Sequence, residues 1–247
     1  MRAPPRPPKR PWARAALALL LLCAAPVALL AGAPPARADD RSEAQGLVDR
    51  STLTVQELLT TGDAGAVQDA QRFLRRARAV LVCPRIFRAG FILGGEGGSC
   101  VLVARDASGS WSSPAFYAMA SGSIGLQAGI QDMQVMMMIM SDRGLTALMD
   151  SQFKFGADAS LAVATIGAGV EGSTTAAAGA DIIAFARSRG LFAGLALEGS
   201  LLSARSELNR AYYGQDLSAR QVVVAMQAHN PGSDPLRAAL MRHGAAR

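Results

Sequence analysis

The residues of this chain that could do chemistry fall into a few short segments, and two of these are rich in glycine. Gly167-x-Gly169-x-x-Gly172 has the spacing of a dinucleotide-binding loop, which needs a helix opening at its third glycine to hold a pyrophosphate. Ser-Thr-Thr-Ala-Ala-Ala-Gly follows instead, which is a poor helix start. Gly94-Gly-Glu-Gly-Gly98 lacks the Lys-Ser/Thr of a phosphate-binding P-loop. We interpret both segments as turns, the second as the turn of a β-hairpin.

A methionine-rich segment raises the possibility of copper binding. Five methionines lie between Met133 and Met140, and thioethers are ligands of Cu(I). They share one unbroken apolar run with Val135 and Ile139. Because such a run is typical of a strand buried on both faces, we favour a core strand over a copper site.

Catalytic and metal-binding patterns are missing from the sequence. His229 and His243 have no Cys, His or carboxylate neighbour at the spacing of metal ligands. No G-x-S-x-G motif is present, and the carboxylates are scattered singly. We therefore expect no catalytic residue, no metal, no cofactor and no enzymatic activity.

One group of cations is concentrated: Arg72, Arg75, Arg76 and Arg78, followed by Arg85 and Arg88. Cations beside an amphipathic helix can bind anionic lipid headgroups at a membrane surface. The simpler alternative is the solvated end of a helix, where cations interact favourably with the helix dipole.

Two helices are predicted to position these arginines. Residues Ser42–Thr61 carry an apolar stripe at helical spacing, and Ser42 is placed to cap the helix. A second helix is predicted over Ala66–Arg76, with the arginines in its last turn. The stripe of the first helix includes Leu47, Val48, Val55 and Leu58.

Short apolar runs punctuated by glycine predict the rest of the fold. They favour an α+β domain: an antiparallel β-barrel-like or sandwich core with N-terminal and C-terminal helices. Helical turns are expected near Arg143–Asp150 and Ser203–Tyr213, and Ser218 is placed to cap a final helix. Residues 229–247 are expected to form a flexible tail. The predicted strands are Ala79–Cys83, Ala89–Leu93, Ser99–Arg105, Trp111–Ala120, Ser123–Ile130, Met133–Met140, Ala159–Ile166, Asp181–Arg187 and Leu191–Leu197.

The N-terminal segment is typical of a secretory signal peptide. A basic leader precedes an apolar run and a Pro-Pro-Ala-Arg-Ala site, which predicts a signal peptide over residues 1–38 that is cleaved after Ala38. A membrane anchor is the alternative, but Pro26, Gly32 and Pro34 interrupt the run. We therefore expect export to the periplasm or cell envelope.

The leader also explains the basic pI of about 9.9. Six of the 25 basic residues and none of the 19 acidic residues lie in it, so the remaining chain is formally neutral. We therefore expect no nucleic-acid binding.

Cys83 and Cys100 remain after cleavage, and an envelope compartment would permit a disulfide. If Gly94–Gly98 forms the hairpin turn, Cys100 lies opposite about Ile92, and Cys83 lies beyond the paired region. We therefore predict two buried free thiols, which counting thiols in denatured protein would test.

Several phrases, in order, resemble the SYLF domain family. They cover about Ser42 to Val224 and are short individually, but their joint order is specific. They are Pro84-Arg-Ile-Phe-Arg-Ala-Gly-Phe-Ile-Leu-Gly-Gly95, Gly109-Ser-Trp-Ser-Ser-Pro114, Ser123-Ile-Gly-Leu-Gln-Ala-Gly-Ile-Gln131, Phe155-Gly-Ala-Asp158, Ser188-Arg-Gly-Leu-Phe-Ala-Gly194, Leu197-Glu-Gly199 and Tyr212-Tyr-Gly214.

The resemblance implies lipid binding, which in some eukaryotic members uses an N-terminal amphipathic helix and nearby basic residues. It implies no catalysis. Actin binding belongs to eukaryotic members, so actin is not expected as a partner of an exported bacterial chain.

The leading hypothesis is that residues 39–228 form a SYLF-like domain that binds anionic phospholipid or a membrane surface. An envelope structural or protein-interaction module without a lipid ligand is the alternative, and a hydrolase is a third hypothesis that rests only on the compartment. The predicted lipid contacts are Leu47, Val48, Val55, Leu58, Arg72, Arg75, Arg76 and Arg78.

Overall fold

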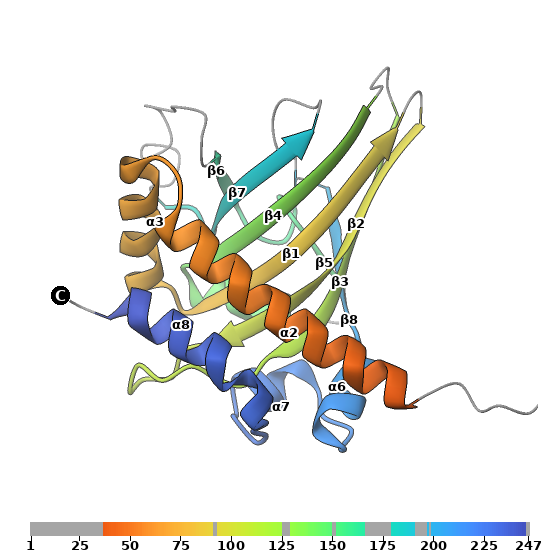
Figure 1. Ribbon diagram of the computed structural model, residues 1–247, viewed down its shortest axis with the longest axis vertical. Helices are drawn as coiled ribbons and strands as arrows, with labels where there is room; N and C mark the ends of the chain where they lie inside the picture. The colour runs from red at the N-terminus through yellow and green to blue at the C-terminus, as the bar shows by residue number, and fades with distance from the viewer. Residues whose placement is uncertain are drawn as a thin grey trace, which may run out of the picture. The chain divides into compact units, whose positions relative to one another are not determined.

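The structure is a computed structural model that describes residues 37–90, 93–124, 129–149, 152–165, 179–190, 197 and 199–245 (Figure 1). The signal peptide prediction and the Gly167–Gly172 motif fall outside these residues, apart from Arg37 and Ala38. The elements are α2 (Arg37–Thr60), α3 (Ala64–Arg76), β1 (Ala79–Gly90), β2 (Leu93–Ala104), β3 (Ala115–Ile124), β4 (Gly129–Ile139), α4 (Asp142–Leu148), β5 (Gln152–Lys154), β6 (Leu161–Thr165), β7 (Ile182–Gly190), β8 (Leu201–Ala204), α6 (Ser206–Tyr213), α7 (Ala219–Val223), η2 (Pro231–Ser233) and α8 (Asp234–Gly244).

The strands form one curled sheet in the order β5-β8-β3-β2-β1-β4-β7-β6. All neighbours are antiparallel except β6 and β7, which are parallel. α2 crosses one face of this sheet diagonally, with α3 and α8 beside it (Figure 1). The α+β prediction, with a barrel-like antiparallel core and helices at both ends, is confirmed.

The two faces of the sheet bury separate apolar clusters. Val80 and Val82 of β1 face α2, α3, α6 and α8, whereas Leu81 and Cys83 face the inside of the curl. β4 alternates in the same way, with Met136 towards the helices and Met137 towards the inside. The prediction that the methionine-rich segment is a strand buried on both faces is therefore confirmed.

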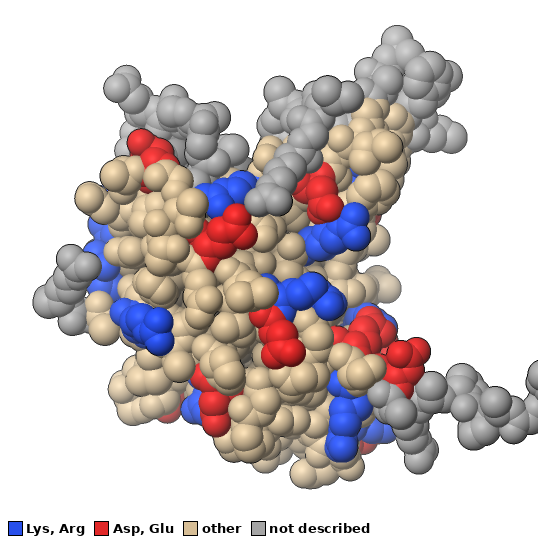
Figure 2. All heavy atoms as spheres, in the orientation of Figure 1, with Lys and Arg blue, Asp and Glu red and all other residues tan. Residues whose placement is uncertain are grey.

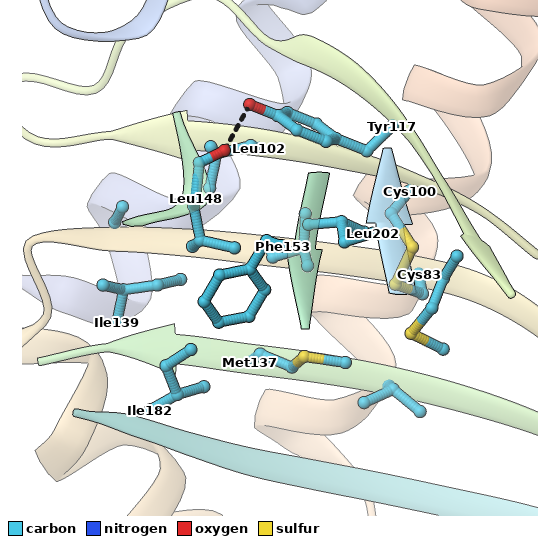
Figure 3. Close-up of a cluster of buried hydrophobic side chains, with 14 of the residues drawn as sticks. Cys83, Cys100, Leu102, Tyr117, Met137, Ile139, Leu148, Phe153, Ile182 and Leu202 are labelled. Atoms are coloured by element: carbon cyan, nitrogen blue, oxygen red, sulfur yellow. Dashed lines mark hydrogen bonds between the residues drawn. A yellow bond between two sulfur atoms is a disulfide. The ribbon is translucent and has the colours of Figure 1, made fainter. Parts of the chain in front are cut away.

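The inner cluster is closed by short elements. Phe153 of β5 lies among Met137, Leu202 and Leu148, and the Tyr117 hydroxyl donates to the Leu148 carbonyl at 3.0 Å (Figure 3). This hydrogen bond satisfies a buried phenol and fastens α4 to β3.

Both predicted N-terminal helices are present. α2 begins at Arg37, so Ser42 lies inside the helix and donates to the Asp39 carbonyl instead of capping it, which corrects that detail. α3 begins one residue after Asp63, whose carboxylate accepts from the Ala66 amide at 3.0 Å. Within the described residues, no helix combines the length and hydrophobicity of a membrane span.

The hairpin prediction at Gly94–Gly98 is wrong. β1 continues to Gly90 and β2 begins at Leu93, so the glycine-rich segment lies inside β2. Val82 pairs with Val101 and Arg85 with Ser99, which leaves Cys83 and Pro84 opposite the single residue Cys100. This is a β-bulge, a position that tolerates a proline because proline has no N–H to donate.

The bulge also corrects the prediction of two free thiols. It brings the Cα atoms of Cys83 and Cys100 to 4.2 Å, and their sulfurs form a disulfide. The bond lies on the inner face of the sheet and joins β1 to β2 where their register shifts.

The C-terminal segment differs from the flexible tail expected for residues 229–247. α8 buries Leu236, Ala239 and Leu240, which have helical i, i+3, i+4 spacing, against α2 and α3. Pro235 lies in the first turn of α8, where proline is tolerated, and so does not break the helix. The predicted cap of α7 is confirmed, since Ser218 and Gln221 form a capping box.

Candidate functional site

The four apolar residues predicted to contact lipid lie in the core. Leu47, Val48, Val55 and Leu58 are buried between α2 and the sheet. The stripe therefore packs on the protein itself and does not face solvent in this structure. Leu53, on the opposite side of α2, is exposed.

The arginines at the end of α3 lie at the surface, as predicted. Arg72 pairs with Asp69 at 2.8 Å and lies over the Phe73 ring, and Arg78 contacts Asp142 at 3.4 Å. Such exposed pairs contribute little to stability and exchange readily with other anions. Arg76 is exposed and forms no ion pair with any residue that the structure describes.

The C-terminal ends of α3 and α8 converge on Arg105. Its guanidinium donates to the Arg75 carbonyl at 3.0 Å and to the Gly244 carbonyl at 3.5 Å, and it stacks on Trp111 at 4.4 Å. Helix C-termini carry partial negative charge, so one cation compensates both ends.

This convergence adds Arg242 of α8 to the arginines of α3. Burial and the adjacent Arg242 lower the pKa of His243. Basic side chains gather at the edge of the molecule where α3 and α8 end (Figure 2). We call this surface the basic corner, made of Arg72, Arg75, Arg76, Arg78 and Arg242.

A hollow of about 370 Å³ adjoins the basic corner, with Arg76 and the apolar Phe73, Met140 and Ile183 among its lining residues. Asp181 also lines it, but its carboxylate is already engaged. Ser141 Oγ donates to it at 2.6 Å, and Ser160 donates through both its amide and its hydroxyl. The Arg143 guanidinium also donates to it, and Arg143 above all, followed by Ser141 and Ser160, holds the pKa of Asp181 well below its usual range.

Arg85 and Arg88 do not extend the basic corner. β-strand alternation turns them to opposite faces of β1 beyond the bulge. Arg85 is exposed and pairs with Asp132 at 2.8 Å. Arg88 turns inwards, where its Nε lies 3.3 Å from Glu96 and the two side chains are 13% and 1% exposed.

Ser113, His229 and Asp234 lie near one another where the C-terminal segment meets the β2–β3 connection. Ser113 Oγ lies 3.4 Å from His229 Nδ1, and His229 Nε2 lies 3.7 Å from Asp234. Ser113 also contacts Ser233 at 3.2 Å, so these residues fasten the C-terminal segment to the β2–β3 connection. Across the described residues, no group of His, Cys, Asp and Glu could hold a metal ion.

Sequence reasoning missed Arg105 and Arg242. The helical spacing of Leu236, Ala239 and Leu240 would have indicated α8, and with it Arg242. Nothing local in the sequence identifies Arg105 as the residue that joins two helix ends.

Comparison with known proteins gives consistent matches. A profile of the family described as Ysc84, Las17-binding protein actin regulator, matches residues 120–243. LAS seventeen-binding protein 3 of Saccharomyces cerevisiae is 32% identical over 166 residues, which are 66% of this chain and 36% of the relative. SH3 domain-containing YSC84-like protein 1 of Homo sapiens is 34% identical over 139 residues, which are 56% of this chain and 41% of the relative. The match thus spans well under half of each relative's length.

Proposed function

This chain belongs to the Ysc84 (SYLF) family, and we propose that it is a non-enzymatic protein that binds anionic phospholipid surfaces in the bacterial cell envelope. The observation that carries the proposal is the basic corner. Each cation held near an anionic membrane contributes roughly 1 kcal/mol to binding, and several act together here. The buried stripe of α2 takes no part in this contact.

Location in the envelope is supported by two independent features. The leader of residues 1–38 has the pattern of a signal peptide. The Cys83–Cys100 disulfide is of a kind that persists in oxidising compartments and is rare in the cytosol. N-terminal sequencing of protein from an envelope fraction should begin at Asp39, and a cytoplasmic chain that retains Met1 would contradict export.

Vesicle sedimentation tests lipid binding. The wild-type protein should sediment with phosphatidylglycerol-containing vesicles at low salt, much less at 0.5 M salt, and not with pure phosphatidylcholine vesicles, because screening weakens surface attraction. Arg76→Glu with Arg78→Glu should lower partitioning at least tenfold, since each site changes from attraction to repulsion.

The matched control reverses the same number of charges elsewhere, in Arg210→Glu with Arg220→Glu, two exposed arginines of α6 and α7. This variant should bind nearly as the wild type does. Equal loss in both variants would reject the basic corner as the site. No sedimentation of the wild type at low salt would reject lipid binding itself.

A second candidate function is binding of a protein partner. The family description names Las17 binding and actin regulation, which runs counter to the expectation that actin is not a partner. Co-sedimentation with filamentous actin tests this function directly. Pelleting with actin but not with vesicles would favour the interaction module, and pelleting with neither would remove actin as the partner.

A further inference from the structure

A groove separates the middle of α2, at Leu47 and Arg50, from the strands beyond the bulge. Its volume is about 630 Å³, within the range of small-molecule sites. α2 leaves the far ends of β1 and β2 uncovered (Figure 1). The lining residues place the groove at this margin, between α2 and these strand ends. The lining residues are Leu47, Arg50, Pro84, Arg85, Phe87, Gly97, Gly98 and Ser99.

The charged side chains that line the groove are both cations. Arg50 forms no ion pair with any described residue, and the partner of Arg85, Asp132, lies in an adjoining hollow of about 200 Å³. The Arg85–Asp132 pair is exposed on both sides and is therefore weak. Two guanidinium groups facing one concavity match the geometry of a phosphate, which accepts paired N–H donors.

An apolar surface continues from these cations across the sheet. Phe87 is 42% exposed and Ile130 is 61% exposed. Alternation along β2 and β3 places Gly95, Gly97, Ala118 and Ala120 on the same face, all at least partly exposed. These small residues form the floor of the apolar surface.

The backbone of β2 does not require glycine at Gly95 or Gly97. A Cβ atom added at Gly97 would lie 3.5 Å from the Met119 carbonyl oxygen, and one at Gly95 would lie 3.7 Å from that of Ser121, which are ordinary contacts. Neither residue has a positive φ. Glycine weakens a strand interior, and one role of such a glycine is to let a ligand approach the backbone closely.

We propose that this groove binds one anionic amphiphile, with its phosphate between Arg50 and Arg85 and its hydrocarbon chain across Phe87 and the small residues of β2 and β3. The proposal rests on the proposed lipid-binding function and adds a site for a single lipid molecule. This site is distinct from the basic corner, which lies on the other side of the bulge along β1. A membrane surface needs only the basic corner, whereas a groove needs a ligand of matching shape.

Isothermal titration calorimetry with dihexanoyl phosphatidic acid below its micelle concentration tests the groove. Arg50→Ala should weaken binding at least tenfold, because a charge-assisted contact to phosphate is lost. Gly97→Leu should abolish binding by occupying the floor. Phe87→Ser gives a second apolar test that inserts nothing into the sheet, and it should weaken binding severalfold. Arg210→Glu with Arg220→Glu, which lies outside both the groove and the basic corner, should leave the affinity unchanged.

The outcomes separate the two proposals. Wild-type affinity in Arg50→Ala and in Phe87→Ser would overturn the groove. Equal affinity for inorganic phosphate would show a site for a free anion and overturn the amphiphile, and equal affinity for dihexanoyl phosphatidylcholine would overturn the charge selectivity. If short-chain lipid does not bind while vesicle sedimentation persists, the groove fails and the proposed function stands. If the protein binds neither the short-chain lipid nor the vesicles, both the groove and the proposed function are rejected.

Discussion

The two halves of the β1–β2 hairpin differ across the bulge at Pro84. Before it, Ala79–Cys83 is fully buried, with helices over one face and the inner cluster against the other. Beyond it, Arg85–Gly90 pairs with the glycine-rich half of β2, and one face is open to solvent. One continuous hairpin is therefore core in one half and, in the other, exposes the face on which we propose the ligand groove.

Beyond the bulge the inner face of the sheet is still buried, but polar residues fill it around Arg88. Arg88 pairs across the sheet with Gln131 on one side and Glu96 on the other, and Glu96 lies beside Ser121 of β3. Ser121 and Ser200 each donate to the Glu96 carboxylate at 3.1 Å. Polar groups that pair with one another thus take the place of the apolar packing found in the buried half.

Removing the disulfide should lower the stability of the fold most, because the bond joins β1 to β2 at the bulge, where the two halves of the hairpin meet. Cys83→Ser with Cys100→Ser should lower the free energy of unfolding by about 3 kcal/mol, as expected for a loop closed by residues 17 apart in sequence. Urea unfolding of the oxidised wild type and the variant measures this. The reduced wild type serves as a control and should resemble the variant. An unchanged midpoint of unfolding would show that β1 and β2 hold together without the disulfide.

Gly98 and Gly97 are neighbours in β2 and give a matched pair of variants for the next largest expected change in stability. A Cβ atom at Gly98 would lie 2.3 Å from the Arg85 carbonyl oxygen in the bulge, so Gly98→Ala should cost about 2 kcal/mol. Gly97→Ala meets no such obstacle and should change stability by less than about 0.5 kcal/mol. Thermal unfolding of both variants compares them. Equal destabilisation would contradict the view that Gly98 serves the bulge while Gly97 serves the groove.

The smallest effect concerns the closed end of the sheet, where Asp181 joins α4 to the starts of β6 and β7. Asp181→Asn should cost about 1 kcal/mol at pH 7, because hydrogen bonds to a charged acceptor are weakened. The depressed pKa means that the charged form stabilises the fold above about pH 4 and that this stabilisation is lost as the pH falls through the folded-state pKa. Unfolding from pH 7 to pH 2 should therefore show the two curves converging in acid. If the difference in unfolding free energy stayed constant with pH, the cost of the substitution would come from packing and not from the charge of Asp181.

The fold was predictable wherever a local pattern has one physical cause. An unbroken run such as Met133–Met140 indicates burial on both faces, and the spacing of the apolar residues in α2 and α3 indicates helices. The bulge was not predictable, because glycines inside a strand and glycines in a turn look alike until the register is known. The disulfide depends on that register.

The site was only partly predictable for a similar reason. The apolar stripe of α2 has the same sequence pattern whether it packs on a sheet or on a membrane, and only the tertiary structure distinguishes them. Arg85 and Arg88 were grouped with the α3 arginines by proximity in sequence, although strand alternation separates them. Arg50 carried no local signal, since its place in the groove depends on contacts with β1 and β2.

The burial of α2 also constrains the order of events during synthesis. This helix is made before every other described element, yet its partners are strands β1, β2, β4 and β7 together with α6 and α8, which end near the C-terminus. Contacts so distant in sequence form late. A nascent chain that stops before Ser206 therefore lacks the elements that cover the side of α2 facing α6 and α8, and that side stays exposed until the C-terminal segment is made.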